Sequence, residues 1–156
     1  MTRRSDERLR SLLCGAAVLV LSGVSLLLPL KSRADDKPAP PWVAPADARA
    51  VKNPLKKDPK VLSAGVESFQ ENCQVCHGIG GEGNGPTAKS LTIKPANFTD
   101  PKVMSKETDG SLFWKMSKGR GAMPAWEDQL SETERWQLVV YIRSLAGKAP
   151  GAKKPE

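Results

Sequence analysis

Histidine and cysteine, the usual nitrogen and sulfur ligands of metal ions, are scarce in this sequence. It contains a single histidine, His77, and three cysteines. Cys14 lies in an apolar run near the N-terminus, so only Cys73 and Cys76 remain to act together with His77. A structural zinc site takes about four nitrogen or sulfur ligands, and this set is too small to supply them.

The sequence also lacks the patterns of nucleotide and nucleic-acid binding. Residues 78–86 are rich in glycine, but no Gly-Lys-Ser or Gly-Lys-Thr follows them, which excludes a phosphate-binding loop of that type. We expect instead a loop that wraps closely around a neighbouring group. No stripe of basic residues alternates with aromatic ones, so nucleic-acid binding is not expected. The net charge of +7 falls to +3 when the six basic and two acidic residues of positions 1–34 are set aside.

The N-terminus has the composition of a secretory signal peptide. Four arginines precede residues 11–30, which carry no charge, and Ser32-Arg33-Ala34 has the small-x-small pattern of a signal-peptidase site. We predict that residues 1–34 are a signal peptide that is cleaved after export to the periplasm. The alternative is that residues 11–30, about long enough to cross a bilayer, are retained as a membrane anchor.

Three segments are expected after the signal peptide. Residues 35–57 are rich in proline and alanine, a composition that predicts an arm or linker without regular elements. Within it, Trp42 either packs on the folded domain or lies exposed on a tether. Residues 58–147 are predicted to form the compact domain, and residues 148–156 a disordered tail.

Three helices are indicated within the compact domain, each by a capping residue and by apolar residues at helical spacing. The first carries the two cysteines at its C-terminal end, and the third has the best-defined start, a capping box. The expected starts are Asp58-Pro59, Thr108, and Ser131 with Glu134, and the expected ends of the second and third helices are Gly119 and Gly147.

The two cysteines and the histidine form one motif, Cys73-Gln74-Val75-Cys76-His77. A Cys-x-x-Cys pair can also be a redox-active dithiol or a disulfide loop, but no βαβ pattern follows, as a thioredoxin-like domain would require. Two thiols at this spacing with a histidine directly after them are the attachment signature of c-type haem. The thiols add to two vinyl groups on one edge of the porphyrin, and the histidine can bind the iron. We predict one covalently bound haem c held by Cys73, Cys76 and His77.

Three methionines after residue 34 are candidates for the opposite axial position of the iron. Met116 lies on the apolar face of the second helix, where core packing is the usual role. Met104 lies in a polar segment, and no feature of the sequence around it would hold its side chain in place. Met123 lies in a glycine-flanked loop and is followed by Pro124, which stiffens the backbone. A soft thioether on a stiffened loop suits a low-spin electron-transfer haem, so Met123 is the predicted ligand.

Residues 64–147 resemble the class I mono-haem c-type cytochromes, in particular a bacterial subgroup with a Cys-x-x-Cys-His motif, a Gly-Pro pair and a downstream Met-Pro ligand loop. In that family a glycine and an aromatic residue on the first helix cross the last helix. Gly65 and Phe69 match the first pair, and Leu138 and Tyr141 match their partners. The resemblance implies an all-α class I cytochrome c fold, with three to five helices around one covalently bound haem and crossing N- and C-terminal helices.

The same resemblance implies how the axial histidine is held. In the family, the carbonyl of the proline in the Gly-Pro pair accepts a hydrogen bond from the ligand histidine, and Pro86 matches that position for His77. Asn84 stands where the family pattern has an aspartate, so one loop carboxylate is missing.

The resemblance implies a periplasmic one-electron carrier that cycles between Fe(III) and Fe(II) and is not an enzyme, because His77 and Met123 leave no open iron position. Its partners would be redox proteins, with membrane contact only if the leader is retained as an anchor. An alternative is an electron-transfer haem subunit of a larger periplasmic or membrane oxidoreductase complex. A third alternative is a gas-sensing or peroxidase-like haem protein, against which the lack of a second histidine argues.

Overall fold

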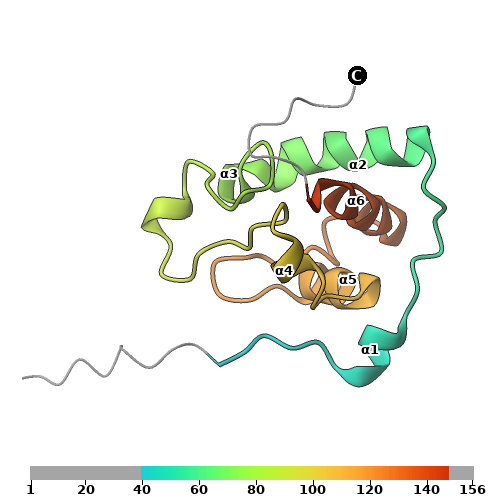
Figure 1. Ribbon diagram of the computed structural model, residues 1–156, viewed down its shortest axis with the longest axis horizontal. Coiled ribbons are helices and arrows are strands. Elements are labelled where there is room, and N and C mark those ends of the chain that lie inside the picture. The colour runs from blue at the N-terminus through green and yellow to red at the C-terminus, as the bar shows by residue number, and fades with distance from the viewer. Residues whose placement is uncertain (1–39, 148–156) are drawn as a thin grey trace, which may run out of the picture. The chain divides into compact units, whose positions relative to one another are not determined.

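The computed structural model describes residues 40–147, and every regular element in that range is helical (Figure 1). The predicted all-α class is confirmed. The predicted signal peptide and tail, residues 1–34 and 148–156, lie outside the described residues. The elements are α1 (Ala46–Ala50), α2 (Pro59–Asn72), α3 (Gln74–His77), the short 3-10 helix η1 (Ala88–Ser90), α4 (Pro101–Met104), α5 (Asp109–Lys118) and α6 (Glu132–Leu145).

Six α-helices in the described range exceed the expected three to five, because three of them are very short. Helices α1, α3 and α4 have five, four and four residues. One turn of helix is too short to produce a periodic pattern in the sequence, and a turn of this kind is stable only through its neighbours in the fold.

The three longer helices begin where their capping residues predict. The side chain of Asp58 accepts a hydrogen bond from Lys60 N at 2.8 Å at the start of α2. Thr108 caps α5 in the same way. Ser131 and Glu134 form the predicted capping box of α6, and its hydrogen bonds lower the pKa of the Glu134 carboxyl group. Helix α5 ends at Lys118 with Gly119, the predicted stop, as its C-cap, whereas α6 ends at Leu145, two residues before the predicted stop at Gly147.

Helices α2 and α6 pack tightly against each other, as the crossing predicted from Gly65 requires. A Cβ added to Gly65 would lie 2.9 Å from both the carbonyl carbon of Gln137 and the Cβ of Tyr141. One turn further along α2, the ring of Phe69 meets the ring of Tyr141 edge to face, with centroids 5.0 Å apart. Glycine at position 65 is therefore what allows the two backbones to approach.

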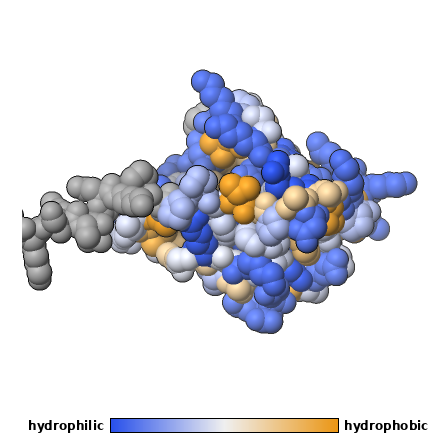
Figure 2. Space-filling model, turned by 90° about the horizontal axis from the view of Figure 1, so that it is seen from below, coloured by the Kyte–Doolittle hydropathy of each residue, from blue (hydrophilic) through white to orange (hydrophobic). Residues whose placement is uncertain are grey.

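The core lies between α2, α5 and α6. Its most deeply buried side chains are Phe69, Leu138 and Val139. Phe113 of α5 stacks on Trp136 of α6 with ring centroids 4.0 Å apart. Figure 2 shows the molecule from below relative to the view of Figure 1. The surface on this face is mostly hydrophilic, and its apolar residues lie in separate spots.

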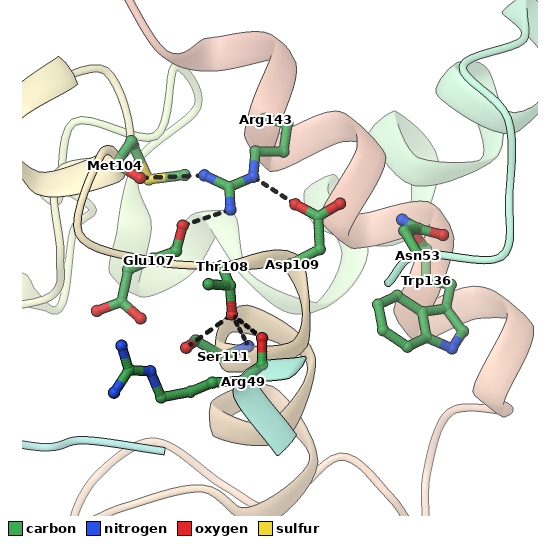
Figure 3. A network of polar contacts seen from close by, with 9 residues as sticks. All are labelled: Arg49, Asn53, Met104, Glu107, Thr108, Asp109, Ser111, Trp136 and Arg143. Atoms are coloured by element: carbon green, nitrogen blue, oxygen red, sulfur yellow. Dashed lines mark hydrogen bonds and ion pairs between the residues drawn. The ribbon is translucent and has the colours of Figure 1, made fainter. Parts of the chain in front are cut away.

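An arginine of α6 joins the three C-terminal helices through polar contacts. The Nε atom of Arg143 donates to the Asp109 carboxylate at 2.7 Å, and its terminal nitrogens donate to the carbonyl oxygens of Met104 and Glu107 (Figure 3). One guanidinium group thus satisfies carbonyls at the end of α4 and in the turn before α5, and holds both against α6.

The arm before α2 is part of the folded domain. Our expectation that its composition excludes regular structure is wrong at Ala46–Ala50, which form α1. Alanine has the highest helix propensity, and α1 gains further stability by packing on α5. Thr108 Oγ1 donates to the carbonyl of Arg49 at 2.9 Å, and Asn53 Nδ2 donates to the carbonyl of Trp136 at 3.1 Å (Figure 3).

Replacing Gly65 with alanine should lower the free energy of unfolding by roughly 1–3 kcal/mol, because the new methyl group would meet the α6 backbone. Denaturant titration followed by helical circular dichroism measures the change. Ser63→Ala, at an exposed position of the same helix, is the control and should shift stability by less than about 0.5 kcal/mol. Equal stability of Gly65→Ala and the wild-type protein would show that α2 and α6 do not approach closely at this point.

Candidate haem site

The end of α2 and the single turn of α3 place the cysteine–histidine motif. Cys73 ends α2 and also begins α3: its amide donates to Phe69 O at 2.9 Å, and its carbonyl accepts from His77 N at 2.9 Å. The helical turn therefore gathers Cys73, Cys76 and His77 within five consecutive residues, which begin one turn after Phe69, the residue whose ring contacts Tyr141 of α6.

Both thiols of the motif are free and are not joined in a disulfide. Cys73 packs against the hydrophobic core, and this burial raises the pKa of its thiol to about 12. The sulfur of Cys76 lies 3.1 Å from Thr87 Oγ1, whose own hydrogen is donated to Val75 O at 2.9 Å. The thiol of Cys76 is therefore the donor to Thr87, and the two sulfur atoms would carry the thioether bonds to a haem.

His77 is oriented by one hydrogen bond and one aromatic contact. Its Nδ1 atom lies 3.2 Å from the carbonyl oxygen of Ala96, and its ring stacks on Phe98 with centroids 4.5 Å apart and an interplanar angle of 16°. Burial lowers the pKa of His77, and the smaller effect of the Ala96 carbonyl opposes it. A neutral imidazole that donates from Nδ1 keeps the lone pair of Nε2 available to a metal.

The carbonyl that holds His77 belongs to Ala96 and not to Pro86, so this prediction is wrong. The segment around Pro86 pairs with the motif elsewhere: Gly85 N donates to Cys76 O and Thr87 N donates to Val75 O, both at 3.1 Å. Ala96 reaches His77 because the chain returns to the glycine-rich loop two residues later. There the backbone amide of Phe98 donates to the carbonyl of Gly81 and fixes this segment against the loop. The signal in the sequence is the first proline after this loop, Pro95, which is followed by Ala-Asn-Phe.

The glycine-rich loop wraps closely around the motif, as predicted. Gly83 N donates to the carbonyl of His77 at 2.7 Å, with the backbone of Gly83 in the left-handed region at φ 78°. A Cβ added to Gly85 would lie 2.5 Å from Val75 O and 2.7 Å from Cys76 O. Only glycine permits this close approach to the haem-attachment turn.

The structure separates the three candidate methionine ligands by burial. Met104 and Met116 are 3% and 4% exposed and belong to the hydrophobic core. Met123 is only partly buried at the edge of that same core, which Cys73 also borders. Its loop is closed by reciprocal backbone hydrogen bonds with Arg120 of 2.9 and 3.0 Å, and Gly119 and Gly121 adopt positive φ on either side of Arg120. Met123 is therefore the methionine whose thioether is not already enclosed by core side chains.

These residues fit a covalently held haem. Two free thiols three positions apart, an imidazole with an available Nε2 and a thioether on a closed loop are the donors that such a group needs. A helical domain with crossing terminal helices and this donor set is a class I mono-haem c-type cytochrome.

Comparison with known families agrees with this class. The family described as cytochrome c oxidase, cbb3-type, subunit III matches residues 60–142, and the chain belongs to it. Its cofactor is accordingly one covalently attached haem c.

Individual relatives show how much of the chain is shared. The cbb3-type cytochrome c oxidase subunit FixP of Bradyrhizobium diazoefficiens is 37% identical over 84 residues, which are 53% of this chain and 27% of FixP. Cytochrome c6 of Euglena viridis is 31% identical over 88 residues, or 53% of this chain and 91% of that protein. A solved chain of the reducing HAO-like protein complex of Kuenenia stuttgartiensis has 30% identity and a TM-score of 0.55, with 62% of this chain and 49% of that one covered. The chain thus spans far less than two thirds of FixP and of the solved chain.

Replacing both Cys73 and Cys76 with alanine should let the haem pass into acidified organic solvent, because no thioether bond would remain. Each single replacement should keep the haem attached through the remaining sulfur. Solvent extraction followed by absorption spectroscopy of both phases measures this directly, and Ser63→Ala serves as the control with two cysteines intact. Haem that stays with the protein in the double variant would contradict the assignment of these two residues.

Proposed function

We propose that this protein is a periplasmic one-electron carrier whose haem iron is ligated by His77 and Met123. The observation that carries the proposal is the donor set itself. His77 offers Nε2 because its Nδ1 faces the Ala96 carbonyl, and Met123 is the one methionine of the described residues that lies outside the enclosed core.

Each residue of the site has a distinct task in this proposal. Cys73 and Cys76 anchor the haem, and the Ala96 carbonyl holds His77 in one tautomer and raises its basicity. The thioether of Met123 completes the coordination and favours the reduced state of the iron. The bound haem supplies reversible one-electron chemistry between Fe(III) and Fe(II). With both axial positions taken by side chains, no position is left for a substrate, which is why we propose a carrier and not an enzyme.

The periplasmic location rests on the signal peptide expected at residues 1–34. If residues 11–30 are retained, the same domain would be anchored to the membrane. Within residues 40–147, no helix is long and apolar enough to span a bilayer.

Electron exchange with other proteins would occur near the attachment motif. Val75, between the two cysteines, and Ile79, just after His77, are 48% and 76% exposed. Removing exposed apolar side chains from water is favourable, so these two residues suit brief contact with a redox partner.

A second candidate function is a haem subunit of a larger oxidoreductase complex. The family description and the similarity to FixP, an oxidase subunit by name, favour it. Purification of the exported protein under mild conditions distinguishes the two candidates. A carrier is recovered alone, whereas a subunit is recovered in a fixed ratio with other chains.

Replacing Met123 with alanine should abolish the weak far-red absorption band that marks a methionine–iron bond in oxidised class I cytochromes. Visible spectroscopy of the purified oxidised protein is sufficient to measure it. Met116→Leu is the matched control, because it removes a thioether from the core at nearly constant volume and should leave the band in place. Persistence of the band in folded, haem-loaded Met123→Ala protein would show that another residue is the ligand.

A further inference from the structure

The arm that precedes α2 ends against the loop that carries Met123. The guanidinium group of Arg120 donates to the carbonyl oxygen of Pro40 at 2.8 Å. Its central carbon also lies 5.9 Å from the ring centroid of Trp42, and Lys115 Nζ of α5 lies 5.6 Å from the same ring. Trp42 is half-buried and contacts two cations, one from the helix and one from the loop.

Arg120 is the residue through which the arm reaches Met123. The backbone of Arg120 and the backbone of Met123 exchange two hydrogen bonds, of 2.9 and 3.0 Å. The two residues between them, Gly121 and Ala122, are exposed, and a Cβ added to Gly121 would meet no atom within 4 Å. The tip of the loop is therefore exposed, and the side chain of Arg120 attaches the loop to the arm.

The arm is itself fixed at several points, so it can act as a rigid support. Ala44 is only 3% exposed. A Cβ added to Gly110 of α5 would lie 2.8 Å from Val51 O, so helix and arm are in close backbone contact. The bonds of Thr108 to Arg49 O and of Asn53 to Trp136 O tie the remainder of the arm to α5 and α6 (Figure 3).

Lys115 completes the support from the side of α5. Its ammonium group forms an ion pair of 2.5 Å with Glu107, and both side chains are largely buried, at 17% and 21% exposed. Because Lys115 is held in this way, the ring of Trp42 contacts a fixed cation of the helix as well as the cation of the loop.

We propose that Trp42 and Arg120 are positioning residues for Met123, and that the arm keeps the thioether on the iron by limiting the motion of the ligand loop. This inference rests on the proposed function, in which Met123 is an axial ligand. It assigns to the arm that precedes α2 a part in keeping the coordination closed.

The binding of free imidazole to the oxidised full-length protein tests this role, since imidazole can bind only when Met123 leaves. Trp42→Ala and Arg120→Gln should each raise the imidazole affinity about fivefold, the effect of losing contacts of this kind. Trp42→Phe, which keeps an aromatic face, should have a smaller effect. The double variant should bind imidazole little more tightly than the stronger single one, because both changes remove the same support.

The matched control is Lys118→Gln, which removes an equal charge near the loop but a side chain that pairs with Glu127 and not with Trp42. It should keep the wild-type imidazole affinity. Unchanged affinity in Trp42→Ala and Arg120→Gln, together with tight binding by Met123→Ala, would overturn the positioning role and leave the ligand assignment intact. Equal affinity of Met123→Ala and the wild-type protein would instead overturn the proposed function. Lower thermal stability of the Trp42 and Arg120 variants with unchanged imidazole affinity would mean that the arm only stabilises the fold.

Discussion

The contact between α2 and α6 is the constraint on which the rest of the structure depends. Gly65 lets the two backbones approach, and the edge-to-face pair of Phe69 and Tyr141 follows one turn later. Cys73 comes one further turn along, where the same helix ends. Any separation of α2 from α6 would therefore displace the attachment motif and open the core that Met123 borders. Stability and cofactor binding are connected through one helix contact.

Around this contact, the site is built mostly from backbone groups. Carbonyl and amide groups of three loop residues, Gly83, Gly85 and Ala96, hold the turn that contains His77. Backbone bonds also close the loop of Met123. Such contacts keep donors in place with little reorganisation, which is what rapid electron transfer requires. The arm adds side-chain contacts to the loop of Met123, the proposed second axial ligand.

Most of the fold follows from short-range signals in the sequence, and the parts that do not follow have identifiable causes. The caps at Asp58, Thr108 and Ser131 were predictable because a capping side chain bonds within three residues of itself. The haem cofactor was predictable because the chemistry of its attachment motif depends on residue type and spacing. The Ala96 carbonyl was not, since a backbone acceptor leaves no side-chain signature and the loop before it sets its position. The fold of residues 40–57 was also missed, because it arises from contacts with α5 and α6 that are distant in sequence.

Carbon monoxide binding to the reduced protein tests the central claim, that side chains of this chain close both axial positions of the iron. Stopped-flow mixing at neutral pH gives the rate directly. Closure by His77 and Met123 predicts slow or incomplete binding, limited by departure of the thioether, while outer-sphere exchange with small redox dyes stays fast. Formation of a full carbon monoxide adduct within milliseconds would contradict the account and identify a ligand-binding haem protein.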